Sequence, residues 1–362
     1  MGQPLPTFNS KRLVGLELEL DCGRAGETRL PSEIEGWKNI ADGSLSAGAR
    51  EFILDPPHKF FEFTKHVEKF DAAVKTARTN IGKKGGFHVH VGAHDISLDQ
   101  ALAVTRLYCH FQPAINRLVG PSRIEDESCS KWCKPFSAGL SRYAIIQRFK
   151  LDEPLASRQL PMGQRALRYW AVNLMFMRCA NPKHRSIEFR QGSPSRRTIN
   201  IVGWACFCAA LVEIARMPEL TKLALATPAT VKDLAEFITT HEGEFDGKGI
   251  GAWVEWRDGW LNGELDVDKL LRRLARNMTY APHGLFFISR TLNLPLSQTK
   301  RFCKIACDQQ KLFPMIVDGG LRFRLPYSVW ASADLGELMA ICSGVTTSIE
   351  EINDDETGEV NE

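Results

Sequence analysis

The chain of 362 residues is 44% hydrophobic and 25% charged, with 28 glycines and 18 prolines. This composition is close to the globular average and excludes collagen, coiled coils and bulk disorder, and the length predicts one large domain of catalytic size plus something smaller. The formal net charge of +3 is uneven, because residues 349–362 hold seven acids and no base, which leaves +10 on residues 1–348. We expect this acidic tail to be solvated and disordered, with the screening of a basic surface as the alternative.

No uninterrupted apolar run reaches the roughly 18 residues that a membrane span needs, and the first residues show neither a signal sequence nor an acylation motif. We therefore expect a soluble, cytoplasmic protein with no membrane partner. The ten cysteines are spread along the chain, and none has the CxxC spacing of a zinc ribbon. They are expected to be reduced thiols rather than disulfides or structural zinc ligands.

The first half of the chain alternates short runs of period two with amphipathic segments, which predicts one α+β domain. The runs predict strands over residues 12–20, 85–92 and 186–190, and the amphipathic segments predict helices over 61–77 and 97–119. Residues 198–217 are apolar on most sides and predict a buried helix that closes this domain.

After residue 217 the pattern becomes mostly helical. From residue 281 it predicts a helix, a turn at 293–296, a helix capped by Ser297 and a hairpin turning at 318–320, the order of a winged helix. The predicted organisation is a catalytic domain (1–217), a helical connector (218–280), a winged helix or a helical cap (281–330), and a C-terminal segment that ends in the acidic tail (331–362).

Three of the predicted strands each carry a polar pair two residues apart. The pairs are Glu17 with Glu19, His88 with His90, and Glu188 with Arg190. Residues i and i+2 of a strand point to the same face, roughly 6.5 to 7 Å apart, while the apolar residues between them line the other face. Each strand thus has one apolar face for helices and one face with carboxylate, imidazole or guanidinium groups.

For a single pair, the solvated face of an antiparallel sheet is an adequate explanation. It does not explain the three together, because a solvated face mixes Lys, Thr and Ser, and because Gly85, Gly86 and Gly92 flank the histidine strand and indicate a close approach to its backbone. Crowded carboxylates repel unless a cation lies between them. Carboxylates with imidazoles suit Mg²⁺ or Mn²⁺, and an arginine on the same face suits phosphate oxygens. The pattern predicts a metal–nucleotide site.

These residues lie in segments that resemble the amidoligase family, the ATP-dependent carboxylate–amine ligases of the glutamine synthetase and glutamate–cysteine ligase superfamily. The resemblance spans residues 12–217. The matching segments, in the order of the family, are GLELEL (15–20), WKNIADGSLSAGAREFILDPP (37–57), GFHVHVG (86–92), PSR (121–123), RYWAVN (168–173) and SIEFRQGS (186–193). The resemblance implies an α+β fold of glutamine synthetase type, a curved antiparallel sheet with helices on one face.

The resemblance also implies roles for single residues. The implied metal ligands are Glu17, Glu19, Glu51, His88 and Glu188. His90 and Ser44 would bind the nucleotide, and Arg190 would neutralise the transferring phosphate. Asp42 would act at the substrate end together with Ser44, and Arg168 is a second phosphate candidate, with a salt-bridge role as its alternative.

The implied cofactors are ATP with Mg²⁺ or Mn²⁺. ATP would phosphorylate a substrate carboxylate, and an amine would attack the resulting acyl phosphate to form an amide or isopeptide bond. The residues identify neither the carboxylate nor the amine.

Two other classes of function remain open. A metal-dependent hydrolase could use the HxH strand to hold Zn²⁺ or Fe²⁺, although this interpretation leaves Glu17, Glu19 and Arg190 without a role. The other class is a nucleic-acid-binding protein that is built on a degenerate ligase domain. It is considered because basic residues crowd the second helix and the hairpin of the predicted winged helix, which would be its recognition helix and wing. These basic residues are Lys300, Arg301, Lys304, Arg322 and Arg324. A helical cap with solvated bases would explain the same segment.

Overall fold

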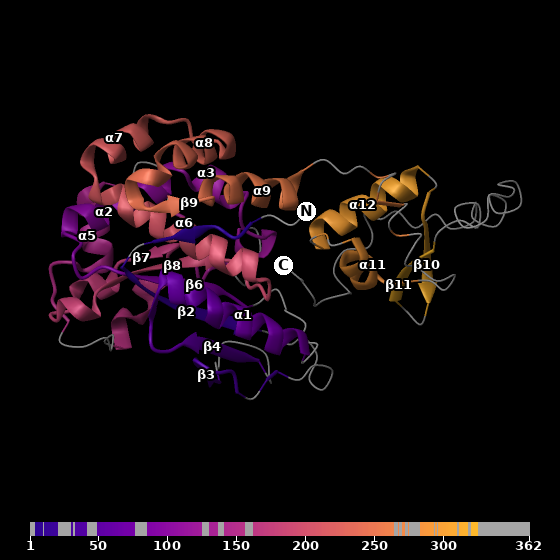
Figure 1. Cartoon of the computed structure of the whole chain (residues 1–362), viewed down its shortest axis with the longest axis horizontal. Helices are drawn as coiled ribbons and strands as arrows, with labels where there is room; N and C mark the ends of the chain where they lie inside the picture. Colours follow the sequence, from indigo (N-terminus) through magenta and orange to yellow (C-terminus); the bar gives the residue numbers. More distant parts are fainter. Residues whose placement is uncertain are drawn as a thin grey trace, which may run out of the picture. The chain divides into compact units, whose positions relative to one another are not determined.

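The alternation of apolar and polar residues in the first half of the chain produces one large sheet in the computed structural model (Figure 1). The structure describes residues 4–9, 11–20, 30–31, 33–41, 49–76, 85–124, 130–136, 141–155, 162–263, 267, 270–271, 274, 283–292, 294, 296–309, 311–317 and 320–324. The chain divides into two compact units, residues 1–258 and residues 259–361, with residue 362 assigned to the first. Residues 218–258, part of the predicted connector, thus belong to the first unit.

The first unit is organised around an antiparallel sheet, in which the described residues form seven strands in the order β3-β4-β2-β6-β8-β7, with β5 also paired to β2. The strands are β2 (Leu13–Leu20), β3 (Trp37–Ile40), β4 (Arg50–Leu54), β5 (His58–Lys59), β6 (Phe87–Gly92), β7 (Val172–Asn173) and β8 (Ser186–Gly192). The predicted strands β2, β6 and β8 are therefore confirmed, and they are consecutive neighbours in the middle of the sheet.

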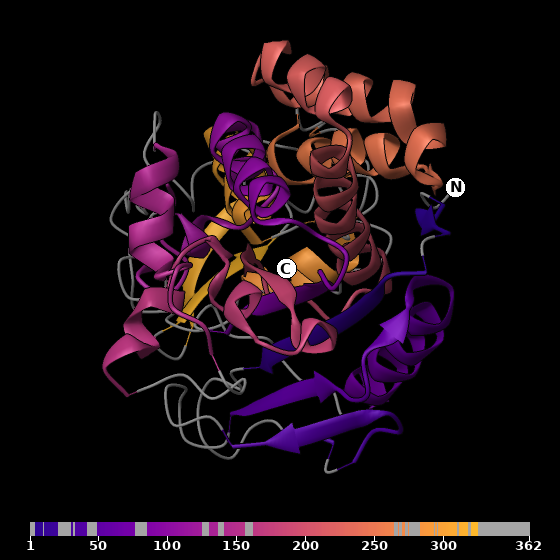
Figure 2. The same ribbon diagram turned by 90° about the vertical axis from the view of Figure 1, so that its left-hand side faces the viewer.

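The apolar residues of these strands lie on the sheet face that the helices cover. Leu16, Leu18, Val89 and Phe189 are fully buried and share one hydrophobic core with the helices α1 (Phe60–Thr76), α2 (Leu98–His110) and α6 (Thr198–Arg216). Figure 2 shows α2 and α6 above the central strands and α1 beside them. A slip of one residue in any strand would turn its apolar residues away from this core, so the burial fixes the register.

Helix α6 is the centre of this core. Among the described residues it is the one helix long and apolar enough to cross a membrane, with a mean hydropathy of 1.8, but 89% of its most apolar window is buried inside the protein. The prediction of a buried helix is confirmed. Asn200 and Glu213 interrupt the apolar residues of α6, so the observation that no uninterrupted apolar run reaches the length of a membrane span holds for this helix too.

The remaining helices follow the amphipathic segments with one correction. The predicted helix over 97–119 is two helices, because the chain turns at Phe111 between α2 and α3. A capping box of Ser97 and Gln100 begins α2. The other elements of this unit are β1 (Thr7–Phe8), α3 (Gln112–Asn116), η1 (Pro121–Arg123), α5 (Arg142–Phe149), η2 (Met162–Arg168), η3 (Met175–Arg178), η4 (Pro182–His184), α7 (Pro218–Ala226), α8 (Val231–His241), η5 (Glu242–Phe245), β9 (Gly247–Lys248) and α9 (Ile250–Asn262).

A buried arginine links the start of the central strand to the helical layer. Arg12, immediately before β2, pairs with Asp95 at 2.7 Å and with Glu213 of α6 at 2.8 Å. Its guanidinium also donates to the carbonyl oxygen of Gly92 at the end of β6. Four parts of the fold, namely the entry to β2, the exit from β6, the loop that follows and α6, are therefore held by one side chain.

The second unit contains α11 (Leu285–Leu292), α12 (Leu296–Asp308) and a hairpin of β10 (Phe313–Val317) and β11 (Gly320–Arg324). It has a hydrophobic core of its own, which includes Leu285, Ile288, Phe302 and Phe323. The prediction that Ser297 caps the second helix is wrong, because α12 begins at Leu296 and Ser297 lies inside its first turn. Residues 318–319 of the predicted hairpin turn and the acidic tail lie outside the described residues.

Candidate active site

The register of the central strands brings the predicted polar residues together on the face opposite the helices. Glu17 of β2 is paired with His88 of β6, and His90 of β6 is paired with Glu188 of β8. The pairing of β6 with β8 shifts between Phe87 and Val89, so that β8 has one extra residue next to Arg190. Directly paired residues in antiparallel strands point to the same face, so four predicted side chains meet across three strands.

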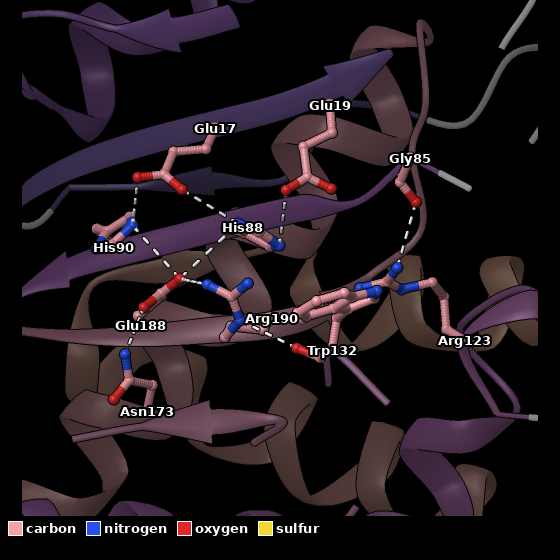
Figure 3. A network of polar contacts seen from close by, with 10 residues as sticks. All are labelled: Glu17, Glu19, Gly85, His88, His90, Arg123, Trp132, Asn173, Glu188 and Arg190. Carbon is pink, nitrogen blue, oxygen red and sulfur yellow. Dashed lines mark hydrogen bonds and ion pairs between the residues drawn. The ribbon is translucent and has the colours of Figure 1, made fainter. Parts of the chain in front are cut away.

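Glu17 lies between the two imidazoles. Its Oε1 is 3.0 Å from His90 Nε2, and its Oε2 is 3.1 Å from His88 Nδ1 (Figure 3). His88 Nε2 is 3.7 Å from an oxygen of Glu19, which extends the cluster along β2. The side chain of His88 is buried, whereas Glu17 and Glu19 remain partly open to solvent.

Glu188 is the second carboxylate of this cluster and is almost fully buried. Its Oε1 pairs with the Arg190 guanidinium and lies 3.8 Å from both His88 Nδ1 and His90 Nε2. Its Oε2 accepts a hydrogen bond of 2.6 Å from Asn173 Nδ2 of β7. The carboxylate is thus oriented from both sides, which a preorganised site requires.

The charges of this cluster depend on one another. Burial would raise the pKa of Glu17, but the imidazoles of His90 and His88 outweigh burial and hold this pKa well below its usual range. Burial would likewise raise the pKa of Glu188, and Arg190 and His90 lower it overall. The carboxylates in turn raise the pKa of Arg190 against the effect of burial. Both carboxylates are therefore ionised at neutral pH.

The donor atoms fit a divalent cation. Glu17, His90 and Glu188 each offer one ligand atom, and these three atoms lie within 4.8 Å of one another. Two carboxylates and one imidazole form a donor set that suits Mg²⁺ or Mn²⁺. This compact set includes His90, which the family resemblance assigns to the nucleotide, while His88 bridges Glu17 and Glu19 beside it.

Glu51 extends the same face towards the sheet edge. It lies in β4 directly opposite Glu19, in the part of the sheet next to the cluster. The structure therefore places four carboxylates on one face of the sheet, with Glu51 on β4, Glu19 and Glu17 on β2, and Glu188 on β8 beyond the histidine strand β6. Asp42 and Ser44 lie outside the described residues.

Arg190 and Arg123 lie beside the carboxylates, and Arg168 lies near the Tyr169 ring that Arg190 also approaches. Arg190 donates from Nε to the carbonyl of Trp132 at 3.2 Å, and the Tyr169 ring lies 5.7 Å from its guanidinium and 5.3 Å from that of Arg168. Arg123 is 1% exposed and donates to the carbonyls of Gly85 and Arg190. The buried Nε atoms of Arg123 and Arg168 have no hydrogen-bond partner among the described residues, and such donors fit phosphate oxygens.

The glycines that flank the histidine strand have a local explanation. A Cβ on Gly85 would lie 2.0 Å from the carbonyl oxygen of Glu19, and one on Gly86 would lie 2.7 Å from the Glu19 carboxylate. The close approach that these glycines indicate is therefore that of the neighbouring strand β2 and its own side chain.

Sequence reasoning assigned no role to three contributors to this site. Asn173 and Arg123 lie in segments of the family resemblance, RYWAVN and PSR, and this resemblance was the available signal. Trp132 contributes its main-chain carbonyl, for which a sequence carries no signal.

Comparison with known proteins adds independent information. Residues 53–212 match the model of a family described as “Putative amidoligase enzyme”. The matched segment contains β6 and β8 with both histidines, Glu188 and Arg190, and it begins after Glu51. No curated protein matches the chain.

Proposed function

Residues 53–212 of this chain belong to the amidoligase family, and from this premise we propose that the protein is an ATP-dependent ligase that joins a carboxylate to an amine. One observation carries the proposal beyond the family: two carboxylates and an imidazole converge within 4.8 Å beside the buried guanidinium of Arg190. Such a site can hold a divalent cation and neutralise phosphate charge at the same place.

We assign the sheet to the glutamine synthetase-like fold. The proposal is supported by its antiparallel strands, its single helical layer formed by α1, α2 and α6, and its polar face on the opposite side. In this assignment the polar face is the floor of the catalytic site.

Each residue of the cluster then has a separate task. Glu17, His90 and Glu188 would hold the divalent cation, and Glu19, Glu51 and His88 would extend this donor set along the same face. The cation supplies charge neutralisation at the phosphate oxygens when it is bound. Asn173 fixes the free oxygen of Glu188, so that this carboxylate keeps its orientation.

The arginines act on the phosphoryl group. Arg190 is kept cationic by Glu188 and points into the cluster, where it stabilises the charge that develops during transfer of the γ-phosphoryl group of ATP. Transfer to the substrate carboxylate breaks the bond between the β- and γ-phosphates and releases ADP. The amine nitrogen then attacks the acyl carbon, phosphate leaves, and the nitrogen loses a proton as the amide forms.

A metal-dependent hydrolase would use the same imidazoles to activate water. The ligase is favoured because the site combines its carboxylates with Arg190 and Arg123, two buried cations that suit phosphate oxygens and that a hydrolase of this kind does not require. The carboxylate and amine substrates are the open part of the proposal, and a panel of both can be screened for ADP release.

Calorimetry of Mg²⁺–ATP binding tests the proposal. Replacing Glu17→Gln or Glu188→Gln removes one negative charge from the cation site, and we expect at least a tenfold loss of Mg²⁺–ATP affinity. Glu68→Gln on α1 is the matched control, because Glu68 is exposed and lies on the helical layer. The control should keep the affinity of the parent protein.

Two results would contradict the proposal. If both site variants remain folded and bind Mg²⁺–ATP as the parent does, the cluster is not the cation site. If the purified protein instead contains stoichiometric zinc or iron and hydrolyses an amide or ester without ATP, the hydrolase is correct.

A further inference from the structure

The second unit has an arrangement of elements that the proposed ligase reaction does not use. Residues 267, 270, 271 and 274 are helical and precede an isolated bridge at His283, which is followed by α11, α12 and the hairpin of β10 and β11. His283 exchanges two main-chain hydrogen bonds of 2.8 Å with Phe323 of β11. The order is therefore helix, a single bridge residue, helix, helix, strand, strand, with the bridge residue paired to the last strand.

One hydrophobic core connects the helices of this unit with β11. It contains Val267, Leu271 and Leu274 of the first helical segment, Ile288 of α11 and Phe302 of α12, and Phe323 of β11 completes it. Because each element buries its apolar side here, the outer side of α12 is left to face solvent.

The outer side of α12 is basic. Lys300 and Arg301 are exposed, and the half-buried Lys304 continues the same face, which ends at an acid, Asp308, in the last turn of the helix. Thr299, Phe302 and other residues of the opposite face are buried. Arg301 also donates to the carbonyl of Gly263 at 3.3 Å, which holds its side chain along the helix surface.

The hairpin adds two more cations. Arg322 and Arg324 alternate with the buried Phe323 in β11 and so share the face that points away from the core. A Cβ on Gly284 would lie 2.6 Å from the Arg322 guanidinium, so this side chain crosses the start of α11. Between residues 283 and 324 the sequence has seven basic and two acidic residues.

We propose that this unit is a winged helix that binds double-stranded DNA, with α12 in the major groove and the hairpin against the phosphate backbone. A helix with its side chains is about 10–12 Å across, and the major groove of B-form DNA is about 12 Å wide. The major groove of A-form RNA is too deep and narrow for a helix, so the geometry favours DNA over double-stranded RNA. The basic face complements the phosphates that border the groove, and phosphate contacts do not depend on base sequence.

The test uses the full chain and a fluorescent DNA duplex of arbitrary sequence, with binding followed by anisotropy between 50 and 200 mM salt, about the range over which phosphate contacts lose affinity. Lys300→Ala combined with Arg301→Ala should weaken binding roughly tenfold or more at the lowest salt, and should reduce the salt slope by about 1.8. Lys222→Ala combined with Lys232→Ala is the matched control, since it removes two exposed lysines from the first unit. This control should bind DNA as the parent does.

Further measurements make each outcome decisive. Thermal unfolding of both double variants must match the parent, and single-site variants Lys300→Ala and Arg301→Ala replace the double variant if it does not fold. A double-stranded RNA of the same sequence should bind more weakly than the DNA. The proposal is overturned if the parent shows no salt-dependent binding to DNA, if both double variants lose affinity equally, or if RNA binds more tightly.

Discussion

The side chain of Arg123 is deeply buried, and among the described residues it makes no hydrogen bond to an acidic side chain. Its guanidinium donates to two main-chain carbonyls, and its Nε has no partner within the part of the chain that the structure describes. A Cβ on Gly86 would lie 3.4 Å from the Nη2 atom of Arg123 and 2.7 Å from the Oε2 atom of Glu19. Burying a cation without a hydrogen-bonded counter-ion is costly, and we therefore expect Arg123 to contact an anionic ligand.

Replacing Arg123→Met keeps most of the side-chain volume and removes the charge. We expect Mg²⁺–ATP affinity to fall at least tenfold, because a buried charge-assisted contact to phosphate is lost. Arg257→Met is the control, since Arg257 is 3% exposed and donates to the carbonyl of Leu118, away from the cluster. Both variants are compared below their melting temperatures by calorimetry. Equal ATP affinity in the two variants would assign Arg123 a purely structural role.

The ion pair of Arg12 with Asp95 links the entry to β2 with the loop after β6, and it predicts that the stability of the fold depends on pH. Burial would raise the pKa of Asp95, but Arg12 outweighs burial and lowers it. A carboxyl group whose pKa is lowered by folding stabilises the protein above its unfolded pKa of about 3.9, and this contribution is lost as pH falls through the folded pKa. Asp95→Asn should therefore lower the free energy of unfolding by about 1–3 kcal/mol at pH 7.

The difference between Asp95→Asn and the parent should shrink as the pH falls below the unfolded pKa of about 3.9 towards the lower folded pKa, because the parent carboxylate then becomes protonated. Chemical denaturation at several pH values measures it. Asp99→Asn is the control, because Asp99 pairs with Arg142 at an exposed site and should cost less than about 1 kcal/mol. A difference that is independent of pH would show that the Asp95 charge does not contribute.

The strands that carry the site could be predicted because each buries one face. In β2, β6 and β8 this requirement enforces strict alternation, which a single sequence displays. The order of the strands and the pairing of His90 with Glu188 depend on contacts between distant segments, which local patterns do not contain. The turn at Phe111 and the two-residue strand β7 are too short to leave a periodic signal.

The candidate site was predictable to the extent that its residues lie on those strands. Glu17, His88, His90, Glu188 and Arg190 are identified by alternation and meet in the structure. Arg123 and Asn173 reach the cluster from η1 and β7, where alternation gives no information. Their positions follow from tertiary packing, so only the family resemblance pointed to their segments.

For the whole molecule, charge is distributed unevenly between the basic part of the chain and its last residues. Residues 349–362 carry seven acids and no base. If these acids compete with DNA for the basic face of α12, truncation after Ser348 should tighten DNA binding and steepen its salt dependence. Anisotropy of the truncated and full chains at low salt measures the effect, and identical curves would contradict it.

The central position of β2 has a consequence for synthesis on the ribosome. Residues 13–20 leave the ribosome before their neighbours β4 and β6, and α6, which shares their hydrophobic core, ends only at Arg216. Until then the apolar face of these strands lacks part of its helical cover, and exposed apolar strand surface of this kind associates with other chains. Premature termination before α6 would therefore yield aggregating fragments, and nascent chains of this length are the natural clients of chaperones that bind extended apolar segments.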